Sequence, residues 1–150
     1  MSSEIKANLT SEMKAAMKAK EKERLTVIRS MLAAIKQVEV DNQTAVDDDA
    51  EILPILDKML KQRRDSQQQY VDAGRPELAE QEAFEMTVIQ SFLPSPLTED
   101  EISGLIDEAV AQTGAASMQD MGKVMGLLKP KMQGRADMAE VSKLIKAKLA

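Results

Sequence analysis

The chain has 150 residues, of which 43% are hydrophobic and 2% aromatic, and a formal net charge of −5. That length allows one domain with a real core or two small helical bundles. It contains no cysteine and no histidine, which excludes disulfides, thiolate nucleophiles, zinc fingers and His-dependent triads. The polar amino terminus and the lack of a long apolar run predict a cytoplasmic protein that does not enter a membrane. The eleven methionines are expected to fill much of the core.

The first 93 residues predict four helices. Apolar residues recur at helical spacing over four stretches, about residues 3–19, 23–41, 51–73 and 76–93. Gly74 ends the third stretch, and Pro76 suits the first position of the fourth, whose apolar face includes Phe84. Because the connecting turns are short, residues 1–93 predict a mostly antiparallel four-helix bundle.

Two polar clusters in this half each allow two interpretations. The acidic run at residues 47–49 is expected to cap the third helix, and a magnesium site is the less favoured alternative. The run at residues 61–66 is favoured as a solvated helix face with a Lys61–Asp65 pair. In the alternative, Arg64 lies near the inward face and holds a carboxylate of another helix or domain.

The expected domain boundary is a linker at residues 94–96, where two prolines favour an extended connector. Three amino-terminal capping residues follow, and each precedes apolar residues at helical spacing: Thr98, Ser117 and Asp137. Residues 97–150 therefore predict a three-helix bundle. Together with the first bundle, this makes the predicted fold class all-α.

The carboxy-terminal part is basic and rich in glycine. Residues 116–150 carry seven Lys or Arg and three Asp or Glu, whereas residues 1–115 carry thirteen and twenty-two. The candidate RNA or partner contacts are Lys123, Lys129, Lys131, Arg135, Gly122, Gly126 and Gly134. We expect Lys129, Lys131 and Arg135 to cluster about a turn. Glycine inside a helix costs about 1 kcal/mol relative to alanine, so Gly122 and Gly126 require either close helix packing or a docking role.

With these residues in view, the sequence resembles the YqeY-like family. The resemblance rests on Gly114, on Asp-Met-Gly-Lys-Val-Met-Gly at residues 120–126, on Pro130 and on Gly-Arg-Ala-Asp at residues 134–137. Residues 13–20 and 62–66 agree with it. The same domain type forms the tail of GatB, a subunit of the glutamine-dependent tRNA amidotransferase. The resemblance implies a larger amino-terminal helical domain, a smaller three-helix domain and a link to transfer RNA.

The function predicted from this resemblance is a stand-alone tRNA-contact or accessory module. The family-level activity, a carbon–nitrogen ligase with glutamine as amide donor, is attributed to other domains of the parent complex. This chain has no cysteine for a glutaminase centre and no phosphate-cradling loop for ATP. The alternative is a protein-interaction adaptor that docks on an amidotransferase or another tRNA-handling enzyme. An enzyme in its own right ranks last, and no catalytic, cofactor-binding or metal-binding residue is predicted.

Overall fold

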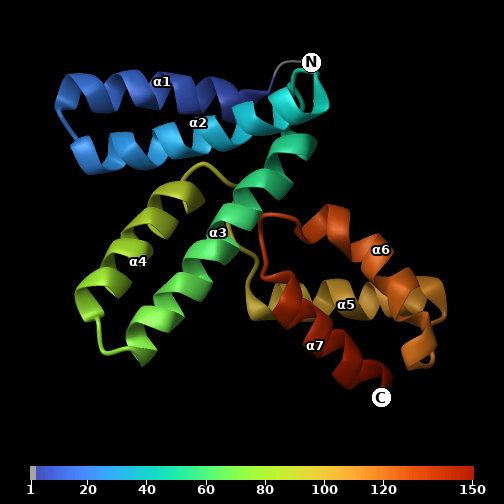
Figure 1. The fold of residues 1–150 in the computed structure, drawn as a ribbon. Helices are drawn as coiled ribbons and strands as arrows, with labels where there is room; N and C mark the ends of the chain where they lie inside the picture. The colour runs from blue at the N-terminus through green and yellow to red at the C-terminus, as the bar shows by residue number, and fades with distance from the viewer. Residues whose placement is uncertain (1–2) are drawn as a thin grey trace. The chain divides into compact units, whose positions relative to one another are not determined.

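A computed structural model describes residues 3–150, and over this range the chain forms seven α-helices, one short 3-10 helix and no strand (Figure 1). The all-α class predicted from the sequence is confirmed. The chain divides into two compact units, Met1–Pro94 and Ser95–Ala150. Within the described residues, no helix combines the length and the apolar character needed to span a bilayer.

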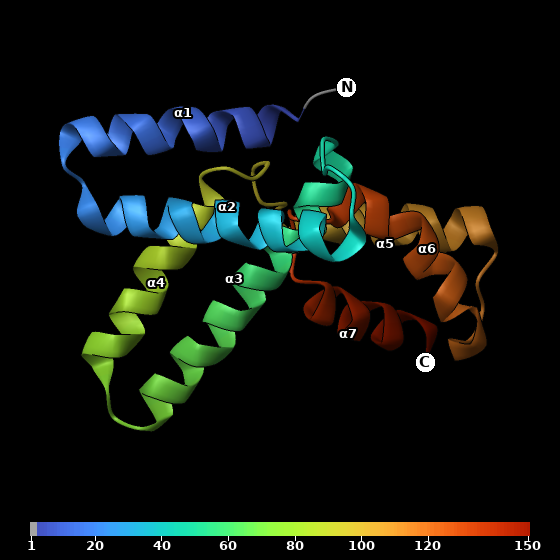
Figure 2. The ribbon, with the colours of Figure 1, turned by 45° about the horizontal axis from the view of Figure 1, so that its top comes forward.

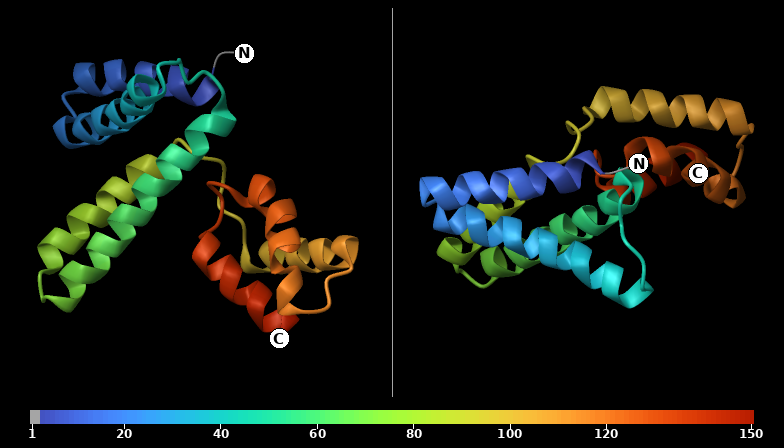
Figure 3. Two further views of the ribbon diagram at one scale, coloured as in Figure 1. Left: turned by 45° about the vertical axis from the view of Figure 1, so that its right-hand side comes forward. Right: turned by 90° about the horizontal axis from the view of Figure 1, so that it is seen from above.

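The first unit consists of two helical hairpins. One hairpin pairs α1 (Glu4–Ala19) with α2 (Lys22–Asn42), which run antiparallel in Figures 1 and 2. The other pairs α3 (Asp49–Asp72) with α4 (Pro76–Gln90), which lie side by side in the left panel of Figure 3. The two hairpins cross, so the bundle is a pair of crossed hairpins and not four aligned helices.

The core of the first unit lies where the two hairpins cross. Its fully buried side chains come from all four helices: Leu9, Ile28, Met31, Ile35, Ile52, Leu56 and Ile89. Most methionines of both units lie in or against a core, although Met17 and Met118 are exposed. Phe84 was expected on the apolar face of α4, but its side chain is 36% exposed.

The inward-facing arginine of α3 is Arg63, not Arg64. The Nε atom of Arg63 lies 3.4 Å from Oε1 of Glu85 on α4, and its Nη1 donates to the Met59 carbonyl at 3.3 Å. The Arg64 side chain is exposed. Met59 and Leu60 are both buried, and each has an arginine one turn later along α3. The arginine that follows Met59 is the less exposed of the two.

The second unit contains α5 (Glu99–Thr113), the 3-10 helix η1 (Met118–Asp120), α6 (Met121–Met132) and α7 (Met138–Leu149). Thr98 and Glu101 form the predicted capping box of α5, with bonds of 3.1 and 3.2 Å. Asp137 caps α7 as predicted. Ser117 opens η1 instead of an α-helix. The core is formed by Ile106, Val124, Leu128, Met132, Val141 and Ile145.

Candidate nucleic-acid interface

Helix α6 has one face in the core and the opposite face in solvent. The buried set is Val124, Leu128 and Met132, and the exposed set is Gly122, Gly126 and Pro130. Each set repeats every four residues, so each forms a stripe along the helix. The outward stripe carries almost no side-chain bulk, and a partner can approach the α6 backbone along it.

The two glycines of this stripe have no packing partner in their own unit. Nothing from the second unit lies within 4 Å of a Cβ atom built on Gly122 or Gly126. Neither has the positive φ that would favour glycine, since only Gly74, Gly114 and Gly134 do so among the described glycines. Close helix packing within this unit is therefore wrong as an explanation for the two glycines. The alternative for these two positions is a docking surface.

Pro130 removes one ordinary helix donor from the same stripe. Proline has no N–H, so it cannot donate to the carbonyl of Gly126 four residues earlier, as an ordinary residue of an α-helix would. That carbonyl oxygen lies among exposed residues. The stripe thus offers a hydrogen-bond acceptor to a partner as well as close backbone approach.

Lys123, Lys129 and Lys131 surround the stripe with positive charge. All three side chains are exposed, and among the described residues none of them forms a hydrogen bond or an ion pair. Lys129 and Lys131 lie within α6 and are about 160° apart around its axis, at about 100° per residue. They therefore lie on opposite sides of Pro130, about 100° from it, and both belong to the last turn of α6, directly before the turn at Gly134. The expectation that they gather about this turn with Arg135 stays a prediction.

The turn itself holds Gly134 and Arg135. Gly134 has φ 77°, a left-handed conformation that a residue with a side chain adopts only with strain. The Nε of Arg135 donates to the Ser95 carbonyl at 2.9 Å, and the Arg135 carbonyl accepts from the Leu97 amide at 2.8 Å. Arg135 thus fixes the segment that leads into α5, a structural role that the sequence did not reveal.

The carboxylate of Asp120 fixes the start of α6. It accepts the amide N–H groups of Ala116 (3.0 Å) and Ser117 (3.3 Å). These two bonds, followed by the nearby Lys123 ammonium, lower the pKa of the Asp120 carboxyl. A carboxylate that is ionised and committed to the backbone does not compete with an anion for the lysines farther along α6.

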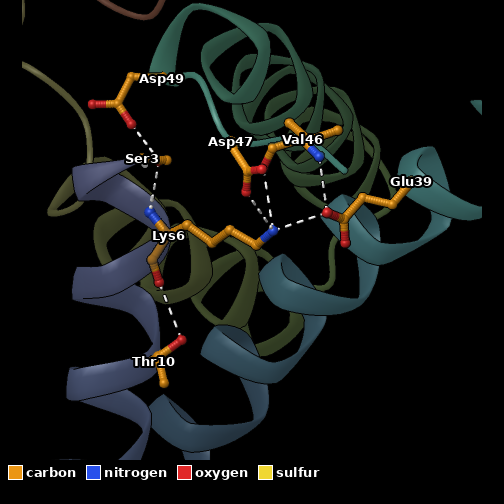
Figure 4. Close-up of polar contacts among 7 residues, drawn as sticks. All are labelled: Ser3, Lys6, Thr10, Glu39, Val46, Asp47 and Asp49. Carbon is orange, nitrogen blue, oxygen red and sulfur yellow. Dashed lines mark hydrogen bonds and ion pairs between the residues drawn. The ribbon is translucent and has the colours of Figure 1, made fainter. Parts of the chain in front are cut away.

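The three aspartates at the start of α3 have three different partners, and Figure 4 shows those of Asp47 and Asp49. Asp48 accepts an amide N–H of α3 at 2.9 Å and caps the helix. Asp49 accepts the Ser3 hydroxyl at the start of α1, and Asp47 lies 3.6 Å from the Lys6 ammonium. In the part of the chain that the structure describes, no three acidic side chains converge as metal ligands would. The capping interpretation is confirmed.

Lys6 is the centre of this junction, which sequence patterns did not identify. Its Nζ lies 2.8 Å from Oε2 of Glu39 and donates to the Val46 carbonyl at 3.2 Å. Glu39 also accepts the Val46 amide at 2.8 Å. The Lys6 hydrogen bond, followed by that of Val46, lowers the pKa of Glu39, and the bond to Glu39 raises the pKa of Lys6. The junction therefore ties α1, α2 and the α3 entry together and has a structural purpose.

Comparison with known proteins adds a family and a set of relatives. The family model described as "Yqey-like protein" matches residues 6–149. A protein of Eremothecium gossypii, named "Altered inheritance of mitochondria protein 41, mitochondrial", is 37% identical over 87 residues, which are 58% of this chain. Proteins with the same name from Vanderwaltozyma polyspora and Lachancea thermotolerans are each 30% identical, over 75% and 78% of this chain.

The relatives are longer than this chain. The matched segments cover 48%, 64% and 66% of those three proteins. Their name refers to the inheritance of mitochondria and mentions neither transfer RNA nor amide transfer.

Proposed function

The chain belongs to the YqeY-like family, and we propose that it is an accessory module that contacts transfer RNA without a catalytic centre of its own. The contact surface is the α6 outer face, defined as Gly122, Lys123, Gly126, Lys129, Pro130 and Lys131. The observation that carries the proposal is the open glycine stripe of α6, flanked by lysines whose side chains form no hydrogen bond or ion pair with a described residue.

The α6 outer face suits a phosphate backbone. Lysine side chains contact phosphates as point charges and fix register without reading sequence. Where Gly122 and Gly126 leave the helix backbone uncovered, a ribose–phosphate chain can approach, and the Gly126 carbonyl can accept from a ribose 2′-hydroxyl. Three phosphate contacts predict weak binding, and they limit the slope of log affinity against log salt to a magnitude of at most about 2 to 3.

The resemblance to the GatB tail supports transfer RNA as the nucleic acid. It does not support amide transfer by this chain, which has no cysteine for a glutaminase centre. We therefore attribute the carbon–nitrogen ligase activity with glutamine as donor to other domains of the amidotransferase.

The experiment is a titration of transfer RNA with the full chain at low salt, repeated over a salt series. The test variant is Lys123→Gln/Lys129→Gln/Lys131→Gln, and the matched control is Lys36→Gln/Lys58→Gln/Lys61→Gln on the first unit. Both remove three exposed positive charges. The test variant should bind more weakly, with a salt slope reduced by about 1 per lysine, while the control should bind as the wild type does. Arg135 is left unchanged because its guanidinium holds Ser95.

Two results would overturn the proposal. One is the absence of transfer RNA binding by the wild type at low salt. The other is equal binding by the test and control variants, because the charge of the α6 outer face would then have no special role.

A protein-interaction adaptor is the second candidate, favoured by Leu127. This side chain is 37% exposed beside the glycine stripe, and an apolar residue next to an open backbone suits a protein helix. The partner proposed is an amidotransferase or another tRNA-handling enzyme. Gly126→Leu should abolish recovery of the partner from lysate, and recovery of the same proteins by this variant would count against the adaptor.

The compartment is proposed separately. The sequence pattern favours the cytoplasm, whereas the relatives are named as mitochondrial proteins. We propose the cytoplasm for this chain on the sequence pattern alone. Fractionation of cells that express a tagged chain tests this, and recovery of the tag in an organelle fraction would refute it.

A further inference from the structure

The first unit carries a second basic surface, at the turn between α1 and α2. Residues 13–24 contain five basic and two acidic side chains. The other residues of 1–94 contain eight basic and fifteen acidic ones. An acidic unit that concentrates positive charge in twelve residues has a local surface suited to an anion.

Four lysines of this segment are free to bind. Lys14, Lys18, Lys20 and Lys22, here called the basic turn, are exposed, and none forms an ion pair with another described residue. The fifth basic residue is not free, because the Arg24 guanidinium lies 3.3 Å from Glu12 and 3.8 Å from Glu21. It also lies 5.7 Å from the centre of the Phe92 ring. Arg24 is thus part of the framework, and the lysines supply the uncommitted charge.

An apolar groove opens beside the basic turn. It lies between the start of α2 and the second half of α4, with a volume of about 450 Å³, within the usual range of ligand sites. Lys22 and Arg24 line one wall, and Phe84, Thr87 and Val88 line the other. Phe84 is the most exposed of the chain's aromatic residues. A ring of this kind on a groove wall can stack a flat apolar group.

We propose that this groove and the basic turn bind a single-stranded RNA segment, with an unstacked base against Phe84 and its neighbouring phosphates on the lysines. The inference rests on the proposed function, that the chain contacts RNA, and adds the kind of RNA and a second contact. Stacking on an aromatic ring with phosphates on a basic rim is how proteins hold unpaired nucleotides. A duplex cannot use the groove, since its bases are already stacked.

Charge decides between RNA and an acidic polypeptide as the occupant. The groove wall includes Glu21 and Glu23 beside Lys22 and Arg24. Glu21 is neutralised by Arg24, but Glu23 has no ion pair among the described residues. A base is uncharged and can lie next to Glu23 while the phosphates reach outward to the lysines. An acidic peptide would bring carboxylates against that glutamate.

The experiment measures binding of a labelled single-stranded RNA to the full chain, with the same RNA in duplex form, a mononucleotide and polyglutamate as separate arms. The aromatic variants are Phe84→Ala and Phe84→Leu, of which the second keeps the apolar bulk without a ring face. The charge variant is Lys18→Gln/Lys20→Asn/Lys22→Gln, in which asparagine tolerates the left-handed φ of 59° at position 20. Lys36→Gln/Lys58→Gln/Lys61→Gln is the charge control, and thermal unfolding checks the fold of each variant.

Both Phe84 variants should bind the single strand about fivefold more weakly or worse, the lower end of one base–aromatic stack, and the duplex unchanged. The charge variant should reduce the salt slope by about 2, while the charge control should not. If these variants match the control while the α6 triple lysine variant loses binding, the inference fails and the proposed function stands. No RNA binding by the wild type overturns both.

The remaining arms test the occupant. A mononucleotide that binds as tightly as the RNA would make a small nucleotide the ligand and overturn the RNA assignment. Equal displacement of the RNA by polyglutamate would show a general polyanion surface and overturn the base site. If Phe84→Leu binds the single-stranded RNA as tightly as the wild type does, stacking on the ring does not contribute, and the proposed base site is overturned as well.

Discussion

Replacing Gly126 by alanine should stabilise the second unit and weaken its contact with a partner. Gly126 lies in the middle of α6, and nothing from this unit lies within 4 Å of a Cβ built there. In a helix interior, alanine is more favourable than glycine by about 0.8–1 kcal/mol. Pro130 already removes one helix hydrogen bond at this point, so we expect a gain of about 0.5–1 kcal/mol in the free energy of unfolding.

The assay separates the two units by their spectroscopic signals. Tyr70 is the only tyrosine, the chain has no tryptophan, and Tyr70 lies in α3 of the first unit. Tyrosine fluorescence therefore follows the first unit, while far-ultraviolet circular dichroism follows the helices of both. Gly126→Ala should raise the midpoint of part of the dichroism transition by about 2–8 °C and leave the fluorescence transition unchanged.

Gly114→Ala is the control of opposite sign. Gly114 also has open space around it, but its φ is +65°, so alanine there is strained and should destabilise by about 1 kcal/mol. A loss of stability in Gly126→Ala would show that part of the chain occupies the space outside α6, which would refute the docking explanation of the glycines. A gain in stability with unchanged RNA affinity would refute the need for close approach at Gly126.

Two further predictions concern the first unit. The Lys6 and Val46 hydrogen bonds hold the pKa of Glu39 below its ordinary value, so the unfolded chain takes up the proton first as the pH falls. The stabilisation from these bonds is thus present at neutral pH and lost below about pH 4. Glu39→Gln should lower the free energy of unfolding at pH 7 and reduce its change between pH 7 and pH 3. Urea unfolding at the two pH values measures both effects. Arg63→Met should cost about 1–2 kcal/mol in the same assay, because Arg63 and Glu85 are 17% and 22% exposed, between surface and buried pairs. An unchanged midpoint in Arg63→Met would mean that the pair contributes no net stability.

Helix positions could be predicted because caps and apolar spacing are local. Thr98 and Asp137 lie where their helices begin, and each bonds to an amide two or three residues away. The end of α4 was placed three residues too late, at 93 instead of Gln90. The amides of Phe92 and Leu93 bond to carbonyls three residues back instead of four, the tighter turn common at a helix end, and Pro94 follows.

Contacts between distant segments could not be predicted in the same way. Arg135 and Ser95 are forty positions apart, and nothing in the pattern of either residue indicates the other. The crossing of the two hairpins also depends on which apolar faces meet, and helical spacing shows only that each helix has such a face. Phe84 was expected on the apolar face of the fourth helix, and the periodicity of α4 does not show where the core ends.

For the two candidate surfaces, the sequence showed the residue types but not how they are packed. The residue types of the α6 outer face were visible in the sequence, but the absence of a neighbour at Gly122 and Gly126 was not. The lysines of the basic turn were visible as well, although only the groove beside Phe84 gives them a ligand class. Composition thus indicates where anions can bind, and packing indicates which kind of anion fits.

A net charge of −5 does not prevent these surfaces from binding RNA, because charge acts locally at physiological salt. The screening length there is about 8 Å, so acidic side chains farther away exert little repulsion, while a lysine in contact with a phosphate keeps its attraction. Three acidic side chains of the second unit, Glu99, Asp100 and Glu101, lie together at the start of α5 and not on α6. There their negative charge interacts favourably with the helix dipole. At low salt the screening length grows, and the more distant acidic side chains then repel the RNA. Affinity should therefore rise less steeply on dilution of salt than the number of lysine contacts alone predicts, and a slope as steep as that number would refute this account.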